Sequence, residues 1–125
     1  MTTPPELLLL AKKLRQGSSE AEWRAAASRA YYAIYHHARA FHDSLPESGQ
    51  PAPKGAGGDH VDLSHRLKNP APGVNAKLTT QSRRIGIMLD NCRPTRHKAD
   101  YEIRNAFSLD QADELLAMAE RIFSM

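Results

Sequence analysis

The stretch SEAEWRAAASRAYYAIYHHARAFHDSL, residues 19–45, decides the fold class, because no Gly or Pro interrupts it before Pro46. It opens with Ser19 and, three residues later, Glu22, which is the capping-box pattern of a helix start. We therefore expect one long helix of about 25 residues here. No segment of the chain alternates apolar and polar side chains in the way a half-buried strand does.

Signals of the same kind predict shorter helices on both sides of this one. The two prolines at residues 4–5 suit the first turn of a helix that ends at Gly17 after a basic last turn. Farther along, Asp59 is the expected N-cap of a short amphipathic helix with the sequence DHVDLSHRLKN. The segment NPAPG, residues 69–73, should end that helix.

Two more helices are expected in the second half of the chain. Apolar side chains recur at helical spacing over residues 74–92, with an interruption at Gly86, until Pro94 stops or kinks the helix. Ser108 with Gln111 forms a second capping box, which opens a last helix. The inward side chains of that last helix are expected to be Leu109, Ala112, Leu115, Leu116, Ala119 and Phe123.

These elements predict an all-α fold, an antiparallel bundle of four to five helices. A chain of 125 residues has the length of one domain, so we expect residues 1–125 to form a single helical domain. The segment LPESGQPAPKGAGG, residues 45–58, offers little apolar surface to offset the entropy of ordering its backbone. We expect a flexible loop there.

Composition excludes several classes of function. The longest apolar run, LLLLA at residues 7–11, is too short to cross a membrane, and a cytoplasmic location without membrane contact is expected. The single cysteine, Cys92, excludes an internal disulfide and a cysteine-rich metal site, and it is expected in the core. The histidines lack metal-ligand spacing, so we expect no metal and no cofactor. A net charge of +3 permits a polyanionic partner.

The long helix has two faces. At about 100° per residue, one face forms the expected core, with Ala26, Tyr31 and Ala38 at its edges. The members of the core face are Trp23, Ala27, Ala30, Ile34, His37 and Phe41. The opposite face carries Ser28, Arg29, Tyr32, His36 and Arg39, with Tyr35 nearby. This second face is either solvated and packed on a neighbouring helix, or it is a self-association or ligand face.

Arg29 and His36 lie two turns apart on that opposite face, so both side chains can reach one phosphodiester. An arginine that holds the phosphate and a histidine that moves a proton are the pair that an RNase without a metal needs. The same two residues are also common on an ordinary basic helix.

The segment CRPTRHKADYEIRNAF, residues 92–107, is the densest polar cluster in the chain. Four side chains there are potential phosphate contacts, and Asp100 can orient one of the arginines. The four are Arg93, Arg96, His97 and Lys98. In the alternative, Asp100 and Arg96 only pin the turn while Tyr101 closes the end of the bundle.

The two polar segments together resemble a known family. ASRAYYAIYHHARAF followed by CRPTRHKADY and an acidic last helix is similar to the HEPN superfamily, in its small stand-alone prokaryotic branch. The resemblance runs from about Glu20 onward. The positions that match the signatures of that branch are Ser28, Arg29, Tyr31, Tyr32, His36, Arg39, Arg96, Asp100 and Tyr101.

The resemblance implies a homodimeric helical bundle that binds RNA or nucleotide and acts beside a minimal nucleotidyltransferase in a toxin–antitoxin or defence pair. Active members carry Arg, four to six residues and then His, whereas only three residues separate Arg93 from His97 here. Three functions stay open: RNA or nucleotide binding, a catalytically silent dimeric module for the nucleotidyltransferase, and a metal-independent RNase. We expect RNA or nucleotide binding. The catalytic candidates, should the protein also cleave RNA, are Arg93, Arg96 and His97. The expected ligand-binding residues are Arg29, Tyr32, His36, Arg39, Asp100 and Tyr101.

Overall fold

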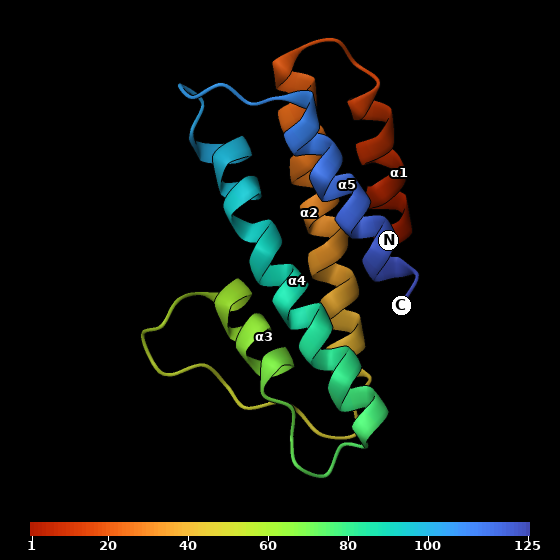
Figure 1. The fold of residues 1–125 in the computed structure, drawn as a ribbon, viewed down its shortest axis with the longest axis vertical. Coiled ribbons are helices and arrows are strands. Elements are labelled where there is room, and N and C mark those ends of the chain that lie inside the picture. The colour runs from red at the N-terminus through yellow and green to blue at the C-terminus, as the bar shows by residue number, and fades with distance from the viewer.

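The computed structural model describes residues 1–125 and contains five helices and no strand, which confirms the all-α prediction. The helices are α1 (Pro4–Arg15), α2 (Glu20–Asp43), α3 (Asp59–Lys68), α4 (Ala76–Tyr101) and α5 (Leu109–Phe123). Four of them run up and down the long axis of the molecule, while α3 is a short helix beside the lower part of α4 (Figure 1). None of the five combines the length and the apolar character that a membrane crossing requires.

The helix starts follow local sequence closely. The capping boxes of Ser19 with Glu22 and of Ser108 with Gln111 are both confirmed. The N-cap predicted for α3 is wrong, because Asp59 is already the first helical residue and Gly58 is the extended N-cap, with no side-chain bond to the helix. Asp59 instead adds negative charge to the first turn, where the helix dipole favours it.

Pro94 does not stop the fourth helix, which runs on through Tyr101. A proline inside a helix removes one hydrogen bond and typically costs about 3 kcal/mol. Contacts beyond Pro94 offset this loss. Ala99 is buried against the core, and the guanidinium of Arg24 on α2 donates to the carbonyl oxygens of Lys98 and Ala99 at 3.0 and 3.1 Å. Residues 92–101 are therefore helical rather than a turn.

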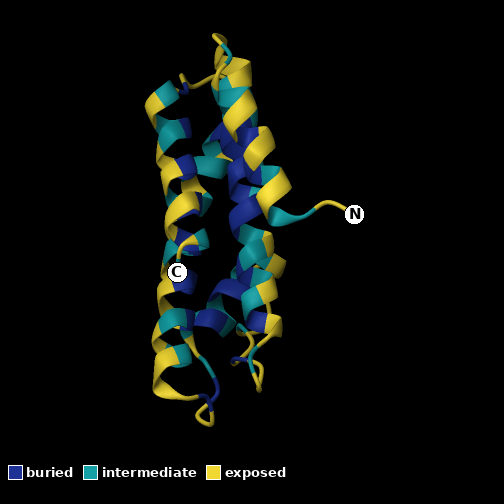
Figure 2. Ribbon diagram, turned by 90° about the vertical axis from the view of Figure 1, so that its right-hand side faces the viewer, coloured by how far each residue is buried: buried dark blue, intermediate teal, exposed yellow.

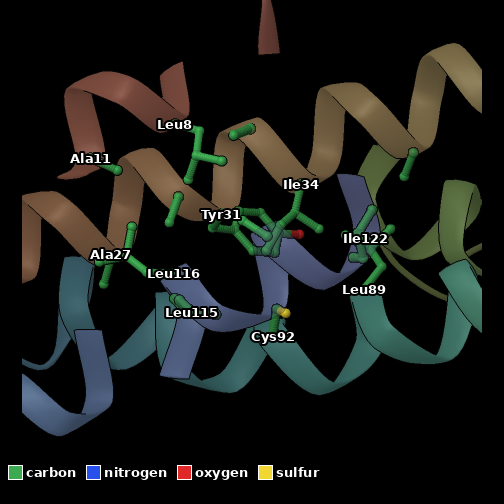
Figure 3. Close-up of a cluster of buried hydrophobic side chains, with 14 of the residues drawn as sticks. Leu8, Ala11, Ala27, Tyr31, Ile34, Leu89, Cys92, Leu115, Leu116 and Ile122 are labelled. Atoms are coloured by element: carbon green, nitrogen blue, oxygen red, sulfur yellow. The ribbon is translucent and has the colours of Figure 1, made fainter. Parts of the chain in front are cut away.

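The core lies where α2 packs against α1, α4 and α5, and buried residues line the inner sides of these helices (Figure 2). Tyr31 occupies the centre of it, fully buried, and is not at the edge as its place on the helical wheel indicated. Leu8, Ile34, Cys92, Leu115 and Ile122 surround it from four different helices (Figure 3). The position of Cys92 in the core is as expected.

Four rings placed in the core by their helical spacing lie at its margin, and Trp23 and Phe41 are two of them. His37 and Phe123 are both half-buried and stack on each other, with ring centroids 4.7 Å apart. In α5 the fully buried position near the end is Ile122, one residue before Phe123. Ile122, three residues after Ala119, thus continues the buried face of α5, and Phe123 packs against the core from its margin.

The segment between α2 and α3 is held by hydrogen bonds to α2 and α3 at residues 49–52. The backbone N–H of Gly49 donates to Nε2 of the buried His42 at 3.1 Å, and the carbonyl of Gly49 accepts from Arg66 at 3.2 Å. Ala52 N–H donates to Asp62 at 2.9 Å. These bonds fix the path of the first half of the loop along α3, and the predicted flexibility stays a prediction.

The closest approach of α3 to α4 is at Gly86. A Cβ at this position would lie 2.8 Å from Cγ of Lys68 and 3.0 Å from Cβ of Leu67. Only a residue without a side chain lets the two helices come this close. As a result, Asp90, one turn farther along α4, lies within reach of α3.

Candidate functional site

Arg96 is the centre of a polar cluster between α2 and α4. Its Nη2 donates to the hydroxyl of Tyr32 at 3.0 Å, and its Nε lies 2.8 Å from Oδ2 of Asp100. The Nε–H is not aligned with that oxygen, so this contact is an ion pair without a hydrogen bond. Asp100 also accepts from the hydroxyl of the buried Ser28 at 3.3 Å. Asp100 thus connects α4 to α2 and fixes the guanidinium of Arg96.

Aromatic rings enclose the same guanidinium. Its central carbon lies 5.5 Å from the ring centroids of Tyr31 and Tyr32 and 5.4 Å from that of Tyr101. These distances are within the range of cation–π attraction. Burial by itself would lower the pKa of Arg96, but the interactions with Tyr32 and Asp100 outweigh it and raise the pKa above its usual value. The charge of Arg96 is held in place and compensated.

Asp90 compensates a second group of cations on the α3 side. It accepts from Nη2 of Arg93 at 2.8 Å and also from Ser64 and Lys68. Burial would raise the pKa of Asp90, but these hydrogen bonds outweigh it and lower the pKa. We call Arg93, Arg96, Asp90 and Asp100 the arginine–carboxylate cluster. Both of its arginines are matched by a carboxylate.

His60 joins α3 to α2 and was not found from the sequence. Its Nδ1 lies 2.7 Å from the hydroxyl of Tyr31, and its ring packs on that of Tyr35 with centroids 4.3 Å apart. Burial, Arg96 and Arg93 lower the pKa of His60. A neutral imidazole can accept a hydrogen bond at Nδ1 from the hydroxyl of Tyr31, whereas an imidazolium cannot. The contact joins residues 29 apart in sequence, and no local pattern indicates it.

A second region, an open pocket of about 520 Å³, lies between the start of α1 and the middle of α2. Its lining residues are Thr2, Pro4, Leu7, Arg29, Tyr32, His36 and Ala40, and we call it the Arg29 pocket. The guanidinium of Arg29 lies 4.7 Å above the ring of Tyr32, and the His36 ring is stacked on the same tyrosine at 6.3 Å.

The electrostatics of the Arg29 pocket differ from those of the cluster. No carboxylate lines the pocket, and the guanidinium of Arg29 takes part in no ion pair. Its one hydrogen bond is a long one, from Nη2 to the hydroxyl of Ser28 at 3.4 Å. An uncompensated guanidinium above an aromatic floor can bind a phosphate or stack on a planar base.

The structure separates the residues expected to form one site. Arg29, Tyr32 and His36 share the pocket, and Arg96 reaches it only through the hydroxyl of Tyr32. His97 points elsewhere: it is exposed, with Nδ1 3.2 Å from Glu102.

The other expected ligand residues also lie outside the pocket. The ring of Tyr101, also exposed, lies 5.0 Å from that of His97. Arg39 donates to the hydroxyl of Tyr35 at 2.9 Å and approaches the cluster only through Tyr35 and His60.

Arg24 is the other residue that sequence reasoning missed. Its guanidinium donates to four carbonyl oxygens at and beyond the end of α4, those of Lys98, Ala99, Glu102 and Asn105. Cations at a helix C-terminus satisfy its unpaired carbonyls and oppose its dipole. The role of Arg24 is thus structural, and the one sequence signal for it was its place beside the core face of α2.

The remaining chemistry-bearing groups are the acidic and histidine side chains outside these two regions and the single cysteine. No group of three or more His, Cys, Asp or Glu side chains is placed to hold a metal ion. Burial raises the pKa of the Cys92 thiol to about 12, so its thiolate is not formed near neutral pH.

No family model, curated protein or solved structure matches the chain.

Proposed function

We propose that the protein binds RNA or a nucleotide through the Arg29 pocket, as the HEPN half of a toxin–antitoxin or defence pair. The pocket is wide enough for a nucleotide's phosphate and base, since it is open and holds about 520 Å³. The observation that carries the proposal is the position of Arg29, uncompensated and 4.7 Å above the ring of Tyr32.

The arginine–carboxylate cluster has a supporting part in this proposal. Arg93 and Arg96 are each matched by an aspartate, so a phosphate would have to displace a carboxylate to bind there. The hydrogen bond from Arg96 holds the hydroxyl of Tyr32 and thereby orients the floor of the pocket. Arg96 is then a positioning residue for the ligand rather than a ligand contact.

The test is a calorimetric titration of the protein with adenosine and guanosine monophosphates and with a short RNA oligonucleotide. Arg29→Met removes the charge and keeps most of the side-chain volume, and we expect it to weaken binding about tenfold or more, because a hydrogen bond to a charged group is lost. Arg121→Met is the matched control, since Arg121 is an exposed α5 cation outside the pocket. Equal affinities of the two variants would reject the Arg29 pocket as the site.

A metal-independent RNase is a second candidate, because the pocket contains both Arg29 and His36. A guanidinium and an imidazole that face one cavity satisfy the first geometric requirement of such a reaction. Cleavage of RNA in the presence of a chelator, lost in His36→Gln while nucleotide affinity is retained, would support it. Binding without any cleavage would leave the protein a binding module.

A catalytically silent interaction module is the third candidate, and one surface favours it. Leu9 and Leu10 on α1 are 63% and 44% exposed and lie beside an open pocket of about 510 Å³. Exposed leucines of this kind are typical of an interface. The partner is either a second copy of the chain or the minimal nucleotidyltransferase. Light scattering and co-purification with the product of the adjacent gene, each repeated with Leu9→Ser, separate the two.

A further inference from the structure

A third pocket-like hollow lies on the N-terminal half of α4, away from both regions described above. It holds about 400 Å³ and is lined by Lys77, Thr80, Gln81, Arg84 and Met125. Thr80 and Gln81 lie three and four residues after Lys77, and Arg84 lies seven residues after it, so the four residues occupy one face of the helix. We call these four residues the α4 basic face.

No negative side chain balances this face. The first turn of α4 contains no acidic residue, and the helix has none before Asp90. Neither Lys77 nor Arg84 takes part in an ion pair, although every cation near Asp90 does. The start of a helix already carries a partial positive charge and normally favours acidic side chains. The face therefore carries two cations, Lys77 and Arg84, that have no ion-pair partner.

The chemistry of the face selects a polyphosphate rather than a base. All four of its side chains are hydrogen-bond donors, two of them charged, and no aromatic ring lines the hollow. Such side chains contact phosphate oxygens, and without an aromatic ring the hollow offers no stacking platform for successive bases. Lys77 and Arg84 are about 10.5 Å apart along the helix axis, which is enough to reach more than one phosphate of a chain.

We propose that the α4 basic face binds the phosphodiester backbone of a single-stranded nucleic acid. This inference deepens the proposed function and rests on its ligand class: the ligand is a polynucleotide, held by its backbone on α4, in addition to any nucleotide held in the Arg29 pocket. Division between a backbone surface and a stacking pocket is the usual arrangement of single-strand binding.

The experiment measures the affinity of the protein for labelled oligonucleotides of about 12 residues, as RNA and as DNA of the same sequence, over a range of salt concentrations. The test variant is Lys77→Ala with Arg84→Ala. The matched control is Lys54→Ala with Arg121→Ala, which removes the same charge from two exposed cations on the α2–α3 loop and α5. Both double variants are checked for the wild-type unfolding midpoint.

Loss of two phosphate contacts should lower the slope of log affinity against log salt by about 1.4, while the control slope stays close to that of wild type. RNA and DNA should lose equally, because phosphates are common to both. Affinity for adenosine monophosphate should not change, since that ligand is assigned to the Arg29 pocket.

Each failure is distinct. If the test variant keeps the wild-type slope while Arg29→Met weakens mononucleotide binding, the α4 basic face is overturned and the proposed function stands. If the slope falls in the test variant but Arg29→Met has no effect on either ligand, the pocket is overturned and the face stands. If polyglutamate of equal charge binds as tightly as the oligonucleotide, and the test variant weakens both equally, the face does not select a nucleic acid and the inference is overturned.

Discussion

The arginine–carboxylate cluster and the Arg29 pocket use the same residue types for opposite purposes. In the cluster, Arg96 is 16% exposed, is paired with Asp100 and is enclosed by tyrosine rings. In the pocket, Arg29 also lies over a tyrosine, but it forms no ion pair, and it is connected to the carboxylate of Asp100 only through the hydroxyl of Ser28. Tyr32 belongs to both regions, since its hydroxyl contacts Arg96 and its ring contacts Arg29.

This difference teaches that a basic, aromatic motif is not by itself a binding site. A paired, desolvated arginine holds helices together, and removing its partner is costly. An unpaired arginine at a pocket wall contributes little to stability and is free to meet an anion.

Asp90→Ala should be the most damaging change, with a loss of about 3 kcal/mol in the free energy of unfolding, because Arg93, Lys68 and Ser64 all lose their acceptor. Urea unfolding followed by circular dichroism measures it. Asp90→Asn, which keeps an acceptor of the same shape, should lose less. If Asp90→Ala also lowers the free energy of nucleotide binding, measured without denaturant, by as much as it lowers the free energy of unfolding, the cluster and the pocket are not separate.

Arg96→Met and Arg29→Met form a matched pair that tests the comparison directly. The first should cost about 2 kcal/mol of stability, because Asp100 loses its cation and Tyr32 its donor. The second should cost less than about 0.5 kcal/mol, as exposed substitutions do, while it weakens ligand binding. Unfolding curves and titrations on both proteins give the answer. A reversed order in the unfolding data would break the contrast.

Tyr32→Phe should have a smaller effect that sharpens the same contrast. It removes the hydrogen bond from Arg96 and keeps the ring below Arg29, so stability should fall by about 1 kcal/mol. Tyr32→Leu, which removes the ring as well, should weaken nucleotide binding further. Equal affinities of the Phe and Leu variants would show that ring stacking contributes nothing to the pocket.

The smallest expected effect is a pH dependence carried by His60. Its pKa is lowered in the folded protein, so its neutral form contributes stability that is present above about pH 6.5 and is lost as the pH falls below that value toward the folded pKa. Because an unfolded histidine begins to take up its proton about one pH unit above its pKa, the first part of this loss falls between about pH 7.5 and about pH 6.5 and is at most about 0.4 kcal/mol there.

Unfolding at the two pH values in wild type and His60→Phe measures the effect. His37, whose pKa burial also lowers, contributes with the same sign, so His37→Phe is the necessary second variant. An unchanged pH dependence in His60→Phe would contradict the assignment.

The sequence predicted the parts of the structure that depend on near neighbours. The capping boxes at Ser19 and Ser108 each need only four residues, and both helices start where those boxes are. Of the two outcomes predicted at Pro94, a stop or a kink, the stop is wrong, because what keeps α4 helical past Pro94 includes hydrogen bonds from Arg24, more than 70 residues away in sequence. Local propensity carries no information about such a contact.

The site was predictable only as a set of residue types. Arg29, Tyr32 and His36 share a helical face, and spacing alone placed them together. The pairing of Arg96 with Asp100 is also local, and its stabilising role was one of the two interpretations that the sequence allowed. In contrast, His60 and the part that α1 plays in the pocket depend on tertiary packing, so no pattern in the sequence announces them.

In the sequence, Gly86 only interrupts the apolar pattern of a helix. In the structure, its close contact with α3 determines where the polar side chains of α3 lie relative to α2 and α4. A methyl group there would push α3 outward and draw Ser64 and Lys68 away from Asp90. His60, carried on the same short helix, would leave Tyr31 at the same time. The absence of a side chain at Gly86 thus lets α3 pack directly on α4, and the surface of α4 at this point sets the distance between the two helices.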